Sequence, residues 1–532
     1  MSATNETPLP LPVDEPGAPP PRAGRREWIG VAALALPCML VVMDLTVLFL
    51  AVPSLSADLN PTSTELLWIT DVYGFLIAGA LIAMGALGDR IGRRRVLLWG
   101  SGAFGAASIL ASLATTPEML IAARGIQGIA GATLIPSTMS LLFAMFPHED
   151  DRMKAIGLIS AGFTSGAALG PILGGLLLDV STWHAVFLIN VPVMLAVLAF
   201  VPRYVPEFAN PAAPRVDLPS AALLMLAVLP ATYGIKRFAR GTGGGLDAAL
   251  ITFGVIVGAL FLARQRRIAN PLVDLSLFRI RLFSVPLAAI VVTTFVMFGT
   301  FFFVSQYFQL VLGLDPLPAA LWGLPGVAAM TLGTTVIVPK LSTRFRPGPL
   351  MAAGAALMAV GLATLSAVDI STSPPVAALV IATFQVGVAP LITLGNNLVL
   401  SAAPPAATGQ ASGTSQTLNE LGGALGIAVL GSVGIALYRG QIDGVPTADL
   451  SAGDAHAVHD TLAGAASVAG HLPPNLLDAA QTAFTHGMSV VALVGAGLML
   501  GVAALLAVAL RDPDAEKASR DAEEPVAELA PA

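Results

Sequence analysis

The sequence has few charged residues and a single cysteine. Only 11% of its 532 residues are charged, whereas 55% are hydrophobic. A soluble protein carries about 25% charged residues, so this chain cannot cover a water-exposed surface of the corresponding size. Cys38 alone excludes an intramolecular disulfide framework and a cysteine-based metal site. Long hydrophobic runs also exclude disorder and coiled coil for most of the chain, and predict an all-α polytopic membrane protein.

Sequence signatures of catalysis are missing as well. There is no nucleotide-binding loop, no H-E-x-x-H helix and no G-x-S-x-G elbow. Two histidines and two aspartates in one late loop, His456, His459, Asp454 and Asp460, do not form the closed ligand set that a metal requires. We therefore predict that the protein is not an enzyme, and that it uses no cofactor, no metal and no nucleic-acid partner.

Hydrophobic runs between turn or charge signals predict fourteen membrane-spanning helices, since about 20 apolar residues cross a bilayer. The runs are 29–50, 68–88, 96–114, 119–143, 155–178, 184–201, 216–236, 246–264, 282–308, 318–340, 349–369, 375–401, 413–437 and 485–510. We interpret the first run as a retained helix rather than a signal peptide, because it is long and follows a Pro-rich tail.

The basic residues predict the orientation of the chain. With the N-terminus in the cytoplasm, 22 of the 27 basic residues fall in cytoplasmic segments and Arg124 falls within a span. Four lie in outer segments: Lys236, Arg237, Arg240 and Arg439. Positive charge stays on the cytoplasmic side, so we expect both termini inside, in the plasma (inner) membrane of a prokaryote. The cluster around Lys236 is the one exception to the pattern.

Weak internal similarity predicts a duplication. The segments around Arg90 and Arg344 are related by an offset of 254 residues, and Ala168–Gly175 and Ala424–Gly431 are related by nearly the same offset. A chance match of Gly/Ala-rich segments is the alternative. Two six-helix halves would leave room for two inserted helices. The predicted divisions are a disordered cytoplasmic tail (1–27), an N-terminal bundle (28–202), inserted helices and linker (203–281), a C-terminal bundle (282–510, with an extracellular loop at 439–483) and a second disordered cytoplasmic tail (511–532).

Several motifs carry a family resemblance. The segment Gly85–Arg95 resembles the signature loop of the major facilitator superfamily, with Gly85, Gly88, Asp89, Arg90, Gly92 and Arg93 at its motif positions. Arg124–Gly128 resembles the helix-4 motif of proton-coupled members. The segment Gly166–Gly175 resembles the antiporter motif, with Gly166, Gly170, Pro171, Gly174 and Gly175 at its positions.

Three further segments resemble the fourteen-helix drug:proton antiporters, the QacA/EmrB-like multidrug exporters. They are Asp44–Val47, Leu67–Phe75 and Arg266–Phe278. The resemblance implies a major-facilitator fold with 14 transmembrane helices arranged 6+2+6. It also implies export of small-molecule drugs from the lipid bilayer or cytoplasm in exchange for protons, driven by the proton gradient.

Two acids in the outward half of the bundle are the first candidates for coupling. Asp44 lies about 24 Å into its helix, and a carboxylate in lipid is expensive, so we expect it to face a wet cavity. At the repeat offset its counterpart is Phe298, so packing alone does not require an acid there. Asp71 lies near the outer start of the next helix, and functional and structural roles are equally open for it. In the resembling exporters such acids carry protons or receive cationic drugs.

Arg124 and Glu420 complete the predicted coupling set. Arg124 is a fixed positive charge that would favour the charged form of a nearby carboxylate; a snorkelling or carbonyl-bonded arginine is the alternative. Glu420 fits a substrate-facing acid or a helix-capping one equally well. The family often has an acid four residues earlier, where this chain has Gln416, which puts binding of doubly charged cations in doubt.

The glycines and the basic loop predict moving interfaces. Gly162, Gly166, Gly170 and Gly174 form a small-residue stripe, either a sliding interface or ordinary tight packing. Pro171 is expected to kink that helix. Asp89 is expected to meet the N-terminal end of the helix at 413–437 and to latch the cytoplasmic side.

Together these features predict a monomeric, proton-coupled exporter of amphipathic, cationic drugs. An adaptable lining of aromatic and methionine side chains is expected from Trp68, Tyr73, Met297, Phe298, Phe301 and Phe302, although each is more often packing than site. An exporter of one endogenous metabolite or antibiotic, giving self-resistance, is the alternative. A transporter-derived sensor or scaffold is a third possibility.

Overall fold

The computed structural model describes residues 22–209, 217–238, 244–268, 271–403, 408–445 and 450–510; the predicted disorder of the tails falls largely outside these ranges. The described residues form helices and connections, with no strand among them. The helices are α1 (Arg25–Leu59), α2 (Ser63–Ile91), α3 (Arg93–Ser112), α4 (Pro117–Gly131), α5 (Leu134–Met145), α6 (Glu149–Val180), α7 (His184–Leu188), α8 (Asn190–Tyr204), α9 (Leu218–Arg237), α10 (Gly245–Gln265), α11 (Arg281–Gln306), α12 (Pro316–Leu332), α13 (Val338–Ser342), α14 (Pro347–Leu365), α15 (Pro374–Ala402), α16 (Thr408–Ile442), α17 (Ala452–Asp460), α18 (Leu462–Ser467) and α19 (Pro474–Ala509).

Thirteen helical segments in the described part of the chain are long and apolar enough to cross a membrane. They match thirteen of the predicted runs. The exception is α3, which has 20 residues but begins with three arginines and is less apolar. At 1.5 Å per residue α3 is about 30 Å long, so it has the length of a span, and the count of fourteen stays a prediction.

Local sequence signals explain where the helices begin. Helices α4, α12, α14, α15 and α19 all start at proline, whose fixed φ suits the first helical position. Helix α2 starts with a capping box: the Glu65 carboxylate accepts a hydrogen bond from the Thr62 backbone N–H at 2.7 Å, and the Thr62 hydroxyl accepts one from the Glu65 N–H.

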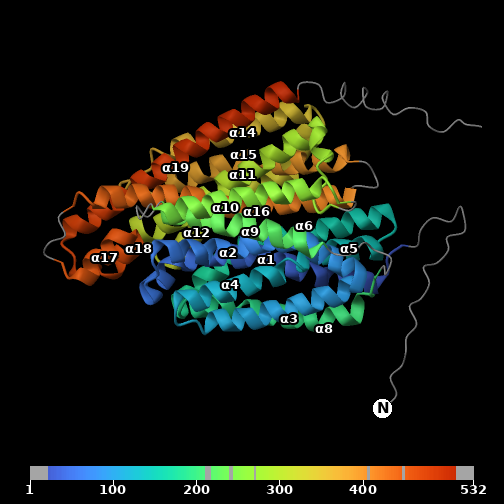
Figure 1. The fold of residues 1–532 in the computed structure, drawn as a ribbon, viewed down its shortest axis with the longest axis horizontal. Coiled ribbons are helices and arrows are strands. Elements are labelled where there is room, and N and C mark those ends of the chain that lie inside the picture. Colours follow the sequence, from blue (N-terminus) through green and yellow to red (C-terminus); the bar gives the residue numbers. More distant parts are fainter. Residues whose placement is uncertain are drawn as a thin grey trace, which may run out of the picture.

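The helices pack as two groups, which we call the N-half (α1–α8) and the C-half (α11–α19) (Figure 1). In the N-half α1 packs on α6 and α8, and α3 packs on α4 and α8. In the C-half α11 packs on α15, α16 and α19. The halves meet where α2 packs on α16, α6 on α12, and α1 on α11. The domain boundaries predicted from the repeat stay an interpretation.

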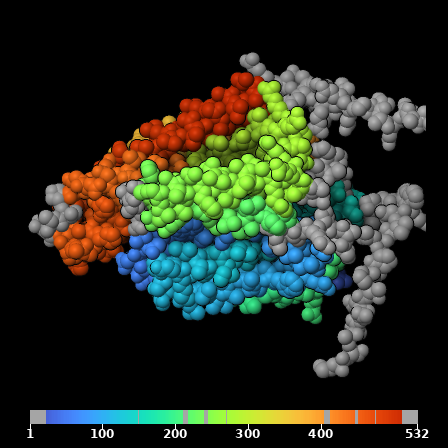
Figure 2. Space-filling model, in the orientation of Figure 1, coloured from blue at the N-terminus to red at the C-terminus, as the bar shows by residue number. Residues whose placement is uncertain are grey.

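The inserted helices α9 and α10 form a hairpin that packs on α2 and α16. Figure 2 shows it on one face of the molecule, between the blue helices of the N-half and the red and orange helices of the C-half. Arg264 donates to Asp217 at 2.9 Å and so joins the two helices of the hairpin. Burial alone would raise the pKa of Asp217, but hydrogen bonds from Ser220 and Arg264 outweigh it and lower that pKa below its usual value.

The glycine stripe of α6 lies against α1. A Cβ atom on Gly162 would lie 2.8 Å from the Ala35 carbonyl oxygen, and one on Gly166 would lie 2.2 Å from the Met39 carbonyl oxygen. Gly170 and Gly174 contact the next two turns of α1. The stripe is therefore a tight contact within the N-half. The adjacent Gly175 approaches the backbone of α12 in the C-half. Tight packing does not exclude a sliding interface, so that interpretation of the stripe stays a prediction.

Replacing Gly166 by alanine should destabilise the fold. The added methyl group forces α1 and α6 apart, because it meets a backbone oxygen that cannot rotate away. Overpacking of this kind costs about 1–3 kcal/mol. Thermal unfolding in detergent checks it, with Gly157→Ala as the control: Gly157 lies on the same helix, but its Cβ would meet no atom within 4 Å. Equal melting temperatures for the two variants would contradict the packing argument.

The two ends of the bundle differ. The α17 end carries the short helices α17 and α18, and α5 lies at the opposite end (Figure 1). We call the opposite end the basic end. Helix α2 starts beside α17, where Arg439 bonds to Ser63 and Asp460, so the end of α2 and Arg93–Arg95 at the start of α3 lie at the basic end. Within the segment predicted as the extracellular loop 439–483, α16 continues to Ile442, the two short helices α17 and α18 follow, and α19 begins at Pro474. Residues 446–449 of this segment lie outside the described ranges.

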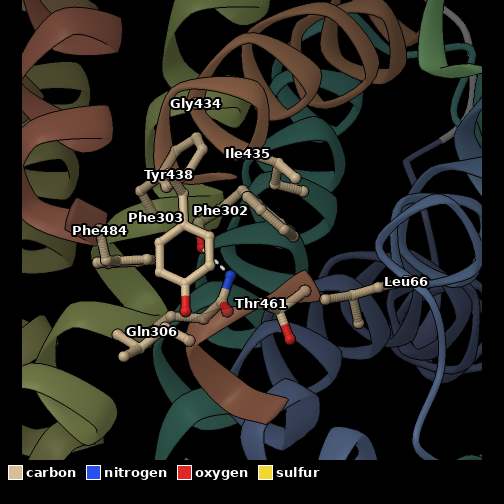
Figure 3. A pocket seen from close by; sticks show the side chains of 10 residues that line it. Leu66, Phe302, Phe303, Gln306, Gly434, Ile435, Tyr438, Thr461 and Phe484 are labelled. Atoms are coloured by element: carbon tan, nitrogen blue, oxygen red, sulfur yellow. Dashed lines mark hydrogen bonds between the residues drawn. The ribbon is translucent and has the colours of Figure 1, made fainter. Parts of the chain in front are cut away.

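A small pocket lies at the α17 end, beneath α18. Figure 3 shows its lining converging from α2, α11, α16, α18 and α19, with the Gln306 amide hydrogen-bonded to the Phe302 carbonyl oxygen at 3.0 Å. The labelled lining residues are Leu66, Phe302, Phe303, Gln306, Gly434, Ile435, Tyr438, Thr461 and Phe484. Because helices of both halves contribute, this end of the interface is capped rather than open.

Candidate functional site

A buried polar cluster lies inside the N-half. Its members are Asp44 (α1), Ser108 (α3), Arg124 and Gln127 (α4) and Asn190 (α8), and all five are at most 4% exposed. Arg124 donates to one carboxylate oxygen of Asp44. The Asn190 amide donates to the other oxygen at 2.7 Å. Three helices, α1, α4 and α8, thus meet at one carboxylate, and Ser108 of α3 joins the cluster through Gln127 and Asn190.

Arg124 is held from several directions. It also donates to the Gln127 side-chain oxygen at 3.0 Å, and Gln127 donates to Ser108 at 2.8 Å. The guanidinium carbon lies 4.5 Å from the centre of the Tyr73 ring and 6.0 Å from that of Phe187. Cation–π contacts of this kind are worth more when the cation is desolvated. Arg124 is therefore a bound charge rather than a snorkelling one.

The prediction that Asp44 faces a wet cavity is wrong for this conformation. Its side chain is only 3% exposed and lies among the helices of one half. Asp44 and Asp71, the two predicted acids, belong to separate ion pairs. Asp44 pairs with Arg124, whereas Asp71 pairs with Lys236. A proton reaches Asp44 only if the packing around the cluster changes.

Asp71 has an unexpected partner. The Lys236 ammonium lies 2.9 Å from each of its two carboxylate oxygens, and both side chains are 0% exposed. The basic-residue count predicts that Lys236 lies in an outer segment; in the structure it is in the last turn of α9 and is buried. Arg439, also assigned to an outer segment, is 7% exposed and bonded to Asp460 and to Ser63. Arg240 lies outside the described ranges.

Glu420 lies well inside α16, which begins at Thr408, so the helix-capping alternative is excluded. The Gln416 side-chain amide donates a hydrogen bond to the Glu420 carboxylate at 2.8 Å. Gln416, which stands where the family often has an acid, therefore holds Glu420 in place. Glu420 is partly exposed. The Tyr73 ring lies 4.5 Å from the Arg124 guanidinium carbon, and Tyr73 also interacts electrostatically with Glu420.

The other predicted lining residues do not gather in one place. Trp68, Met297 and Phe298 are half-buried, and Phe298 packs against Gly423 of α16. Phe301 meets Phe49 of α1 across the halves, with ring centres 5.4 Å apart. Phe302 is buried in the wall of the pocket at the α17 end. Tyr73 is buried against Arg124 rather than lining a cavity in this conformation.

The basic loop between α2 and α3 is closed on itself. Arg93 donates to Asp89 at 2.7 Å, and it lies so close over Gly88 that a Cβ there would be 2.9 Å from the Arg93 chain. The expected contact of Asp89 with the start of α16 stays a prediction, because residues 404–407 lie outside the described ranges. Gly92 has a φ of +117°, which favours glycine. Arg90 is exposed and Gly85 is buried.

Sequence reasoning missed Ser108, Asn190 and Glu207, and it named Gln127 only as part of the motif Arg124–Gly128. The Glu207 carboxylate accepts hydrogen bonds from the Arg94 and Arg95 backbone N–H groups at 2.9 and 3.1 Å and so caps α3. The available signal for Asn190 was an amide side chain within an apolar run, which must find a partner when buried.

Comparison with known proteins gives a consistent family. The family model described as Major Facilitator Superfamily matches residues 34–427. The chain is 40% identical to the multidrug efflux pump LfrA of Mycolicibacterium smegmatis, over 92% of this chain and 97% of that protein. It is 34% identical to the methyl viologen resistance protein SmvA of Salmonella typhimurium (89% and 96% covered) and 34% identical to a tetracenomycin C resistance and export protein of Streptomyces glaucescens (94% and 96%).

Solved structures show the same fold. A bacterial homolog of the human lysosomal transporter Spinster, in an inward-facing and unoccupied conformation, matches with a TM-score of 0.63 at 18% identity, over 92% of this chain and 99% of that one. The POT family transporter PepTSo matches with a TM-score of 0.60 at 15% identity, over 94% and 99%. At these identities the likeness concerns the arrangement of helices alone.

Proposed function

Because this chain belongs to the major facilitator superfamily, we propose that it is a proton-coupled exporter of amphipathic, cationic drugs or toxic compounds. It is a multi-pass membrane protein, and transporters of this superfamily move small molecules. The names of its relatives, a multidrug efflux pump and a methyl viologen resistance protein, support drugs as cargo. The basic end is cytoplasmic in this proposal, so both termini are inside.

The Asp44–Arg124 pair is the observation that carries proton coupling. Asp44 is a carboxylate bound by an arginine that keeps its charge. When Asp44 takes a proton, the carboxylate loses its charge and its attraction to Arg124, and the contacts that join α1, α4 and α8 weaken together. The guanidinium of Arg124 then keeps its hydrogen bond to Gln127 and its cation–π contact with Tyr73. Proton binding thereby acts on the packing of three helices.

Exchange of cargo and proton follows from alternation between two arrangements of the halves. The α17 end is bridged in this structure, since Gln309 of the C-half donates to the Leu50 carbonyl oxygen of α1 at 2.9 Å. This closed contact supports an inward-facing state, in which cargo enters from the cytoplasm or inner leaflet. Glu420, partly exposed on α16, is available to a cation there.

A dedicated exporter of one endogenous metabolite or antibiotic is the second candidate. The similarity to a tetracenomycin C resistance and export protein, over nearly the whole of both chains, favours it. A panel of export substrates in efflux-deficient cells separates the two: a broad exporter raises resistance to several unrelated cations, whereas a dedicated one raises resistance to a single compound.

Gradient-driven uptake into inverted membrane vesicles tests the proposal. We expect a lipophilic cation such as ethidium to accumulate when the vesicle interior is acidified, and to leave again when a protonophore collapses the gradient. Vesicles from cells that lack the protein are the control. Accumulation that ignores the proton gradient would remove proton antiport, and the absence of any accumulation across the substrate panel would remove export.

A further inference from the structure

A lysine ammonium is enclosed where α2, α9 and α16 meet. The Lys236 nitrogen lies 2.9 Å from both carboxylate oxygens of Asp71 and 4.0 Å from the centre of the Trp68 ring. The rings of Tyr233 and Phe75 lie 6.2 and 6.4 Å from that of Trp68. An aromatic face together with a carboxylate is the combination that binds organic cations. Here a side chain of the protein itself fills it.

Packing alone does not account for this pair. Burying an ion pair is weak evidence for stability, because desolvation offsets the attraction and an apolar pair packs as well. The surroundings are apolar: Phe75, Ala424 and Ala428 form a separate hydrophobic cluster that Trp68 and Leu421 adjoin. This cluster belongs to α2 of the N-half and α16 of the C-half, so the charged pair lies at the interface of the halves.

The ammonium is held on a flexible side chain. Lys236 is in the last turn of α9, and its long, unbranched chain reaches Asp71 from there. The other end of the hairpin is fixed separately by Arg264 and Asp217. Trp68 is partly exposed, whereas the side chains of Lys236 and Asp71 are fully buried.

We propose that Asp71, Trp68 and Tyr233 form a binding site for lipophilic monovalent cations, and that Lys236 is a tethered cation that occupies it until cargo displaces it. The site rests on the proposed function, since it names where a cationic cargo is recognised. Cargo and Lys236 compete for the same carboxylate. Binding of cargo therefore also breaks the Lys236–Asp71 ion pair that joins α9 to α2. Occupancy of the site thereby changes how the inserted hairpin is held against the N-half.

Equilibrium binding of tetraphenylphosphonium to the purified protein tests this competition. In Lys236→Met the apolar stem is kept and the competing charge is removed, so we expect binding about three- to tenfold tighter than in wild type. The double variant Asp71→Asn with Lys236→Met should lose that gain. Lys340→Met removes the same charge from an exposed position at the basic end and should bind as wild type does.

Binding by Lys236→Met that is no tighter than wild type would overturn the proposal, as would a double variant that binds as tightly as Lys236→Met. Should Lys236→Met fail to fold, Trp68→Leu decides, because it keeps the ion pair. We expect that variant to bind about three- to tenfold more weakly, and unchanged affinity would refute the site. The assay needs no gradient, so tighter binding by Lys236→Met without gradient-driven transport would overturn the proposed function and keep the site.

Discussion

Asp44→Asn is expected to abolish proton-driven uptake in inverted vesicles, reducing it to the level of vesicles without the protein. Asparagine nearly matches aspartate in shape and keeps an oxygen for the Asn190 amide, but it neither binds a proton at physiological pH nor offsets the charge of Arg124. The matched control is Asp58→Asn. Asp58 lies on the same helix, is exposed and accepts one hydrogen bond from Trp183 at 2.8 Å, so its removal should leave transport unchanged.

The same variant should also lose stability, and a second substitution separates the two effects. Removing one partner of a buried ion pair costs about 3–5 kcal/mol, because the other charge is left without compensation. The double variant Asp44→Asn with Arg124→Gln removes both charges, and its melting temperature should recover towards wild type while uptake stays absent. Recovery of uptake together with stability would show that the pair serves the fold alone.

The parts of this site that the sequence predicted are those that stand out chemically. Asp44 and Arg124 are charges within apolar runs, and a charge at that depth needs a partner, so each stands out as a candidate although their pairing does not follow from the sequence. Ser108 and Asn190 were not predicted, and Gln127 was named only within the segment Arg124–Gly128. Neutral polar side chains are common in membrane helices, and nothing in a single sequence says which helices bring them together.

The basic residues Lys236 and Arg439 show what a topology signal leaves out. Their positive charge predicts on which side of the membrane they lie, but it does not predict their partners. Both side chains are buried and paired with acids that are 165 and 21 residues away. The helices themselves were predicted well because length and apolar character are local properties. The pairing of charges between helices depends on packing, which the sequence does not display.

Loss of Arg439 is expected to open the α17 end. Its guanidinium donates to Ser63 at the start of α2 at 2.8 Å and also pairs with Asp460 at the end of α17. It therefore joins α16, the N-half and the capping helices in the conformation seen here. If, as proposed, the halves alternate, this contact exists only while the α17 end is closed. Each 1.4 kcal/mol removed from one state shifts the populations by about tenfold.

Distance measurements between two spin labels check this shift. Cysteines at Thr115 of the N-half and Ser371 of the C-half, both exposed, carry the labels in a background where buried Cys38 is replaced by serine. Arg439→Gln should move the distances towards longer values, and Lys154→Gln, an exposed change at the basic end, should not.

A companion variant distinguishes opening from general destabilisation. Ser63→Ala removes only the bond between the halves and keeps the Arg439–Asp460 ion pair, so its melting temperature should stay near wild type while its distances lengthen in the same direction by less. A neutral side-chain hydrogen bond is worth about 1 kcal/mol, and one to a charged group about 1.5–3 kcal/mol. That is enough to change the populations severalfold or more. Distances unchanged in both Arg439→Gln and Ser63→Ala would mean that the Phe49–Phe301 and Gln309–Leu50 contacts hold the α17 end closed without Arg439.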